Sequence, residues 1–448
     1  EGDVERYVTL LHASVLLIDS LRAGLETRHE RGIALPAPLL SRATGFVRSF
    51  IAPPAASPFR PQASRLAALD STLAARLIAD VEEAIRDRVN PSLERLANFL
   101  EGDYATSDRL GLGQYPGGVE HYRMLVRQYT TLDITPEEAH AIGLAEVRRI
   151  ADLVQEAMRE AGVSPSRDSL RTWLARAPEF GGSDGESFVE GVRARYDSVR
   201  ARAPIPLGAV PTTVVVVDTM TAAEAQFAPL TRYHPPSVPN PVARYRVAYK
   251  RLRGGSGGGI AGLVYRDLLP GRHVQASWQR QNEQLPAFRR AGDYAGFADG
   301  WRLYALELAD SLASADSPAQ RLGSRLLLLH GACGLVIDTG INYFGWTRDQ
   351  ALEFLREYLP DSDEALEREF IVPAAEDPAS LVAGTVGARE FRGLRRWAQE
   401  ELEDAFDAAD FHTTILLSGA LPLPVVGTRL EWWLWERTAA RADTAALK

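Results

Sequence analysis

Two short stretches of the chain hold residues that are suited to acid/base chemistry. The first runs from Arg266 to Gln275 and contains Asp267 and His273, and the second runs from Asp299 to Tyr304. A carboxylate beside a histidine can transfer protons without a metal ion. We therefore predict that Asp267 and His273 form the proton-transfer pair of a catalytic site.

The remaining polar and aromatic residues of these stretches are predicted to support the pair. Asp299 would converge on the same cavity. Tyr304, about one helical turn further on, could donate a proton or orient a substrate oxygen. Arg266 and Arg272 would hold an anionic group of the substrate or lower the pKa of a nearby carboxylate. Together with Trp301, these two arginines are the predicted substrate-binding residues.

Helices must carry most of these residues. Apolar residues recur at helical spacing, which predicts helices over 7–21, 66–100, 135–161, 273–284, 297–312, 320–336, 348–358 and 386–406. Thr135, Pro136 and Glu138 form the expected start of the third of these helices, with Thr135 as the N-cap.

The pattern changes between residues 204 and 264. Two β-rich runs, 212–217 and 245–252, predict strands, and the glycine-rich stretch 254–259 predicts a mobile connection or active-site flap. The expected fold class is mainly α, a large helical body with a small inserted β-sheet. Three regions, 1–203, 204–264 and 265–448, are expected to form one continuous structural unit.

The two stretches resemble motifs of the bacterial "domain of unknown function 885" family, which is regarded as a family of zinc peptidases with a helical, zincin-like build. That family shows His-Glu-Ala-x-Pro-Gly-His-His-x-Gln and then Glu-Gly-Trp-Ala-x-Tyr. Further blocks in the same order are similar as well, namely 130–131, 138–147, 335–340, 345–347, 411–412 and 419–423. The resemblance covers most of the chain and implies a zincin-like helical body.

The departures from this pattern remove the ligands that zinc requires. Arginine occupies positions 266 and 272, where the family has histidines, and a permanent cation cannot coordinate a metal. Aspartate replaces glutamate at 267 and 299. Glycines replace arginines at 331 and 334, and Asn342 replaces a histidine. We expect positions 266 and 273 to share one helix face, so that His273 and Asp299 alone remain as ligands. The prediction is no metal and no cofactor.

Three functions remain open, in this order. The first is a metal-independent enzyme that cyclises, isomerises, eliminates or hydrolyses a small, largely apolar substrate, with a biosynthetic pathway as one setting for it. The second is a zinc-dependent hydrolase that uses His273, Asp299 and a further carboxylate such as Glu307. The third is a non-catalytic protein that binds a peptide or partner in the inherited cleft. A structural salt bridge between Asp267 and Arg266 or Arg272 is the alternative to a catalytic Asp267.

Composition limits the partners and the location that we expect. The 448 residues carry a net charge of −9, which argues against nucleic acid and an anionic membrane as partners. Cys333 is the only cysteine and lies in an apolar run too short to span a bilayer. The first residues are charged, unlike a signal peptide. A cytoplasmic protein with a small-molecule substrate is expected, and its oligomeric state is left open.

Overall fold

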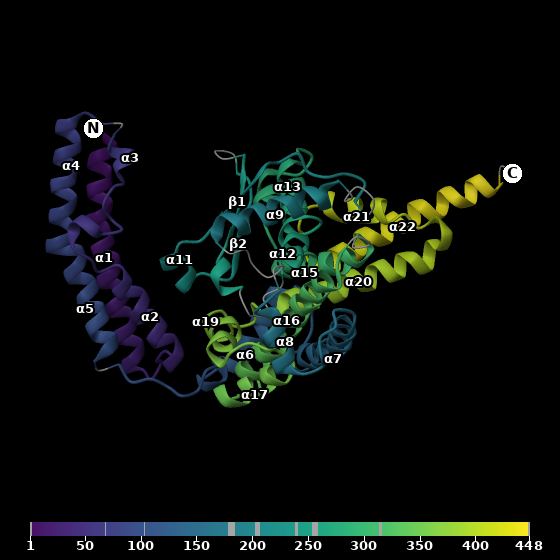
Figure 1. The fold of residues 1–448 in the computed structure, drawn as a ribbon, viewed down its shortest axis with the longest axis horizontal. Helices are drawn as coiled ribbons and strands as arrows, with labels where there is room; N and C mark the ends of the chain where they lie inside the picture. Colours follow the sequence, from purple (N-terminus) through teal and green to yellow (C-terminus); the bar gives the residue numbers. More distant parts are fainter. Residues whose placement is uncertain are drawn as a thin grey trace. The chain divides into compact units, whose positions relative to one another are not determined.

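The fold is mainly helical, as the sequence predicts. A computed structural model describes all residues except 1, 68, 103, 178–183, 202–206, 238–240, 253–258, 313–315 and 447–448. Within the described residues there is a single three-stranded sheet, and helices make up most of the rest (Figure 1). Most of the glycine-rich stretch for which a flap is predicted lies outside the described residues.

The contacts divide the chain into two units, residues 1–110 and 111–448. The sequence-based boundaries at 203 and 264 follow composition, so this division by contacts does not test them. In the first unit, one face of helix α1 packs on the helical segment that follows α3, and the shared core contains Leu11, Val81 and Ile85. The elements of this unit are α1 (Gly2–Glu30), α2 (Ala37–Ser49), η1 (Pro54–Ala56), α3 (Ala63–Leu66), α4 (Ser71–Ala84), the π-turn η2 (Ile85–Val89) and α5 (Asn90–Glu101).

The second unit contains both motif stretches. Its elements before the motifs are η3 (Leu112–Gln114), α6 (Gly118–Thr130), α7 (Pro136–Glu160), α8 (Arg167–Leu174), α9 (Gly185–Arg200), β1 (Val215–Thr219), α11 (Ala222–Phe227), β2 (Thr231–His234), β3 (Ala243–Val247) and η5 (Tyr249–Arg251). The elements that carry and follow the motifs are α12 (Ile260–Leu263), the π-turn η6 (Val264–Leu268), α13 (Arg272–Gln281), α14 (Ala287–Ala291), α15 (Ala295–Leu312), α16 (Pro318–Asn342), α17 (Arg348–Tyr358), α18 (Asp363–Leu366), the π-turn η7 (Glu367–Ile371), α19 (Val372–Glu376), α20 (Val382–Leu402), η8 (Glu403–Ala405), α21 (Ala408–Leu417) and α22 (Leu423–Ala446).

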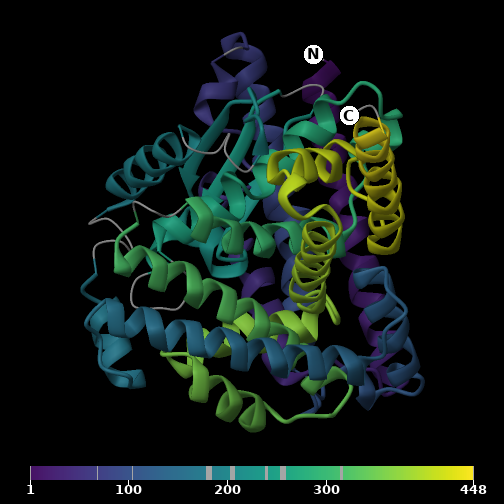
Figure 2. The same ribbon diagram turned by 90° about the vertical axis from the view of Figure 1, so that its right-hand side faces the viewer.

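Two long helix pairs form the centre of the second unit. Helix α7 lies along α16, and α15 lies along α20 (Figure 2). The second pair approaches closely because glycines face each other: a Cβ on Gly387 would lie 1.9 Å from the carbonyl oxygen of Gly296 and 2.8 Å from the Cα of Gly300. Helix α7 begins with the predicted capping box, in which Thr135 and Glu138 each accept a backbone hydrogen bond from the other.

The sheet has the strand order β1-β3-β2, with β1 parallel and β2 antiparallel to β3. Strands β1 and β3 overlap the two predicted runs, although the second run ends early in the 3-10 turn η5. Strand β2 was not predicted, because its four residues alternate too briefly to be recognised. In the register, Tyr233 of β2 pairs with Tyr245 of β3, which places both side chains on one face of the sheet.

The first motif stretch is not one continuous helix, contrary to the expectation that positions 266 and 273 share a helix face. The π-turn η6 ends at Leu268, the chain passes through Leu269, Pro270 and Gly271, and α13 begins at Arg272. Pro270 has no N–H to continue the helical ladder, and a Cβ on residue 271 would lie 1.8 Å from the carbonyl oxygen of Arg266. Position 266 and His273 therefore belong to different elements.

Candidate functional site

Asp267 is a fully buried carboxylate whose two oxygens are both occupied by hydrogen-bond donors. Arg266 donates from Nε and Nη2 to Oδ1 and Oδ2 at 2.9 and 2.8 Å. Arg302, on α15, donates from Nε and Nη2 to Oδ1 at 3.0 and 2.6 Å. The hydroxyl of Tyr245 donates to Oδ2 at 2.9 Å, and Arg266 also reaches Thr231 Oγ1 at 2.7 Å. Asp267 is thus held between two guanidinium groups and a phenol.

This arrangement fixes the charges of its members. Burial alone would raise the pKa of Asp267, but Arg266 and Arg302 hold it well below its usual range. Burial would lower the pKa of Arg302, and the two carboxylates that it contacts, Asp267 and Asp299, raise it instead. Asp267 is therefore an anion at any physiological pH and a weak base.

Asp299 differs from Asp267 because its carboxylate reaches solvent. Its side chain is 42% exposed and accepts one hydrogen bond, from Arg302 Nη1 at 3.0 Å. It lines a cavity of about 380 Å³ between β2, α13 and α15. The cavity is formed by Thr231, Arg232, Tyr233, Arg272, Asp293, Ala295, Ala298, Asp299 and Arg302. Three of these residues are cationic and two are anionic, so the lining carries an excess of one positive charge.

His273 lies behind this cavity and is fully buried. Its Nε2 is 3.2 Å from the carbonyl oxygen of Thr213, which can only accept, so Nε2 carries the proton. Nδ1 then accepts a hydrogen bond from the hydroxyl of Tyr233 at 2.9 Å. Burial lowers the pKa of His273 to about 4, so the imidazole is neutral at pH 7. None of these polar contacts, which also include Ser277 Oγ at 3.4 Å, reaches Asp267.

The other predicted residues divide between the cavity and the interior. Arg272 lines the cavity and forms an ion pair with Asp293. Trp301 is completely buried and donates from Nε1 to the carbonyl oxygen of Pro270 at 3.0 Å. Tyr304 is also buried, and its hydroxyl is 2.9 Å from Nε2 of His412. Burial raises the pKa of Tyr304.

The structure therefore brings Asp267, Arg266 and Asp299 together through Arg302, and it places His273 in a separate set of hydrogen bonds with Tyr233. Sequence reasoning missed Arg302 and both tyrosines of the sheet. The signal for Arg302 was present, because the similar family motif has alanine at the corresponding position. No comparable signal marked Tyr233, because the strand that carries it was not recognised.

The residues around Asp267 do not fit a zinc ion. A zinc site needs lone pairs that are free to coordinate, whereas both oxygens of Asp267 already accept hydrogen bonds and two permanent cations lie beside them. Glu307, the further carboxylate considered for a metal, instead accepts hydrogen bonds from Arg149 at 2.9 Å and Arg392 at 2.6 Å. Among the described residues, no group of three or more His, Cys, Asp or Glu side chains is placed to hold a metal.

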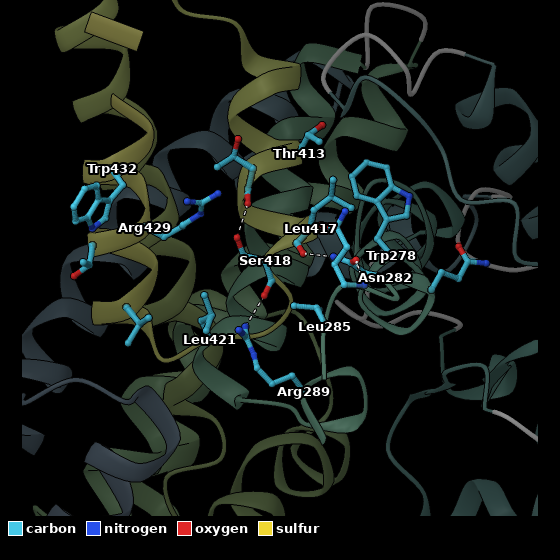
Figure 3. A pocket seen from close by; sticks show the side chains of 15 residues that line it. Trp278, Asn282, Leu285, Arg289, Thr413, Leu417, Ser418, Leu421, Arg429 and Trp432 are labelled. Carbon is cyan, nitrogen blue, oxygen red and sulfur yellow. Dashed lines mark hydrogen bonds between the residues drawn. The ribbon is translucent and has the colours of Figure 1, made fainter. Parts of the chain in front are cut away.

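A cavity larger than the one beside Asp299 lies elsewhere in the second unit. It measures about 910 Å³ and lies between the end of α13, α21 and α22 (Figure 3). Trp278, Arg289, Leu417, Arg429 and Trp432 are among its lining residues, and none of the predicted site residues lines it.

Comparison with known proteins gives a family and a fold. The model of a family described as "Bacterial protein of unknown function (DUF885)" matches residues 1–430. A crystal structure of a "putative lipoprotein" from Colwellia psychrerythraea superimposes with a TM-score of 0.89 at 23% identity, over 97% of this chain and 77% of that one. A "putative lipoprotein of unknown function" from Shewanella oneidensis gives 0.61 at 16% identity, over 82% and 68%. No curated protein matches significantly.

The expectation of a cytoplasmic location is contradicted by these findings. Both similar structures are described as lipoproteins, and helix α1 is long and apolar enough over Val4–Glu30 to resemble a signal or membrane-spanning helix. Only 11% of that apolar window is buried. Among the described residues, the helix Pro318–Asn342 is also long and apolar enough to span a membrane. Its apolar window is 83% buried, so it is a core helix. The expectation was based on the charged residues at the start of the chain and did not take account of the apolar run that follows them.

Proposed function

The chain belongs to this DUF885 family of bacterial proteins, and within that scaffold we propose a metal-independent enzyme that acts on a small anionic molecule in the cavity beside β2. The observation that carries the proposal is the pairing of Tyr233 with His273. A phenol that faces the cavity is hydrogen-bonded to a buried, neutral imidazole. The reaction is a proton transfer that supports cyclisation, isomerisation, elimination or hydrolysis.

In the proposed step, the substrate gives a proton to the hydroxyl oxygen of Tyr233 while the proton of that hydroxyl moves to Nδ1 of His273. The hydrogen bond of Nε2 to Thr213 leaves Nδ1 free to accept it. Because burial disfavours the imidazolium, the proton returns readily through Tyr233 to the product. His273 is thus the base, and Tyr233 transmits the proton.

The charged residues of the cavity bind and orient the substrate. Arg272 and Arg302 face the cavity and would hold a carboxylate or another anionic group. Asp299 accepts a single hydrogen bond among the described residues, so it can accept one more from a substrate donor. Asp267 is a positioning residue in this scheme, since it holds Arg302 from behind.

The test is substrate conversion by the full chain. Bacterial metabolite extract is incubated with purified protein and compared before and after by untargeted mass spectrometry. We expect the wild type to deplete at least one metabolite, and Tyr233→Phe and His273→Asn to lose about 100-fold or more of that rate. Tyr343→Phe, which changes a tyrosine at the C-terminal end of α16, should act as the wild type. Full activity of both site variants would overturn the assignment.

The second candidate is a binding protein without turnover. It is favoured by the complete satisfaction of Asp267, because a fully paired carboxylate is typical of a structural ion pair. It predicts that some metabolite raises the thermal midpoint of the wild type while no metabolite is consumed. The same extract experiment therefore distinguishes the two candidates.

For the location, we propose an envelope-associated protein. The descriptions of the two similar structures support it, and so do the exposed side chains of Leu10, Leu16, Leu17 and Leu21 on α1. Fractionation of cells that express the complete natural gene tests this. The protein should be recovered with the envelope fraction, and recovery with the soluble cytosolic marker would refute the proposal.

A further inference from the structure

A second, smaller cavity is lined by Thr213, whose carbonyl oxygen accepts the hydrogen bond of His273. Its volume is about 300 Å³, which is at the small end of the range for ligand sites. Its walls are apolar where Pro236, Pro241, Ala287 and Ala291 meet, and its cationic side chains are Arg280 and Arg290. None of its described lining residues is acidic, in contrast to the cavity that contains Asp299.

The two arginines of this cavity, as far as the structure describes their surroundings, lack a directly paired carboxylate. Among the described residues neither Arg280 nor Arg290 forms an ion pair, and the buried Nε of Arg290 has no hydrogen-bond partner. Burial and the nearby Arg272 lower the pKa of Arg280, with Asp293 and Tyr233 opposing. A buried donor without a partner is unfavourable, so a ligand that accepts a hydrogen bond from it is stabilised.

The cavity is joined to the proton-transfer pair by hydrogen bonds. Thr213 lines it, its Oγ1 accepts from Gln281 at 2.8 Å, and its carbonyl oxygen accepts from Nε2 of His273. Nδ1 of the same imidazole contacts Tyr233 in the first cavity. His273 therefore connects one residue of the first cavity, Tyr233, with one residue of the second, Thr213.

We propose that this apolar cavity binds a small organic carboxylate, with its carboxylate at Arg280 and Arg290 and its hydrocarbon part against the prolines and alanines. A guanidinium binds a planar carboxylate through two parallel hydrogen bonds. The apolar walls favour a hydrocarbon body over a hydrated inorganic ion. The site does not depend on the acid/base function proposed above.

The experiment is calorimetric titration of the full chain with phenylacetate and hexanoate, each compared with its neutral amide. We expect at least one carboxylate to bind at least about tenfold more tightly than its amide, and inorganic phosphate and acetate to bind more weakly than that carboxylate. Arg280→Gln and Arg290→Gln should each lose about tenfold in affinity. Arg289→Gln is the matched control, since Arg289 donates to the Ser418 carbonyl in the cavity of Figure 3 and does not line this one.

Three results would overturn the proposal. The first is that neither carboxylate binds, and the second is that each carboxylate binds no more tightly than its amide. The third is that acetate binds as tightly as both carboxylates, which would mean that the apolar walls do not contribute to affinity. An equal loss in Arg289→Gln would show that the effect of the other variants is not specific to the cavity. If a variant at position 280 or 290 does not fold, the comparison of carboxylate with amide on the wild type still decides. Binding without any turnover of metabolites would leave this site standing and refute the enzyme.

Discussion

At the scale of single residues, the arrangement around Asp267 shows how charge can be buried without a metal. The carboxylate receives five hydrogen bonds from Arg266, Arg302 and Tyr245. Its identity as a residue of interest was predictable from the motif, and so was its pairing with Arg266. The departure from the family's alanine at Arg302 was visible in the sequence, but only the fold shows that this arginine reaches Asp267.

Removing this carboxylate should be costly. Asp267→Asn leaves two partly buried guanidiniums facing a neutral side chain in place of a fully buried carboxylate, so we expect the free energy of unfolding to fall by about 3–5 kcal/mol. Asp293→Asn, which breaks the ion pair of a 42% exposed carboxylate with Arg272, should cost less than about 1 kcal/mol. Urea denaturation of both variants measures the difference, and equal losses would contradict the structural role of Asp267.

His273 should make stability depend on pH. Its pKa is lowered from an ordinary value of about 6.5 to about 4, so between these values the unfolded chain binds a proton that the folded chain excludes. Stability should therefore fall as the pH drops from 6.5 to 4, by roughly 3 kcal/mol from this residue.

The contribution of His273 is measured by comparing the pH dependence of the unfolding free energy between a variant and the wild type. The comparison is needed because burial also lowers the pKa of His140 and His330. Unfolding free energies measured across this pH range should show a shallower slope in His273→Gln than in the wild type. His121→Gln, at an exposed position of α6, should keep the wild-type slope. Parallel slopes in all three proteins would contradict the buried neutral imidazole.

At the scale of elements, the sequence predicts helices well and strands less well. Long amphipathic runs and the capping box at Thr135 indicated α7 and its partners, since periodicity over many residues is a strong signal. Strand β2 is too short to show a pattern. The break at Pro270 was overlooked because the resemblance suggested one helix. That break places Asp267 and His273 on different elements, and the described hydrogen bonds of His273 go to Tyr233 and Thr213 instead of Asp267.

The close crossing of α15 and α20 is testable by adding one methyl group. Gly387→Ala would place a Cβ 1.9 Å from the backbone oxygen of Gly296, which cannot move without shifting α15 and with it Asp299 and Arg302. We expect a loss of about 1–3 kcal/mol or more in unfolding free energy.

Gly393→Ala is the matched control for this crossing. It lies on the same helix, and a Cβ there meets nothing within 4 Å. It should stabilise the chain by up to about 1 kcal/mol, because alanine favours a helix over glycine. Thermal and urea unfolding of the two variants give the comparison. A tolerated Gly387→Ala would mean that the two helices are less closely packed than described.

At the scale of the whole molecule, the family and the mainly helical fold were predictable because many separate blocks of sequence agreed. The location was not predicted, because the charged residues at the start of the chain were given more weight than the apolar residues of α1. The two units and the placement of their cores depend on contacts between distant segments, which composition does not reveal. The proposed chemistry, by contrast, rests on a few residues of the second unit.

Metal removal distinguishes the proposed enzyme from a zinc hydrolase. Protein purified without chelator should contain well under about one tenth of a zinc ion per chain. Addition of EDTA should leave both the thermal midpoint and any measured turnover unchanged, because the proposed enzyme does not depend on a metal. A protein that binds a metal would instead lose stability when the metal is removed. Stoichiometric zinc, together with loss of turnover in EDTA, would support the hypothesis of a zinc-dependent hydrolase instead.

The enclosure of Asp267 also limits how such a protein can change over evolutionary time. Replacing Arg302 alone by a small residue removes two of the donors to a buried carboxylate, and replacing Asp267 alone strands two cations. Either single step weakens the fold before any gain in metal binding arrives. The residues of this cluster should therefore tolerate joint replacement better than replacement one at a time.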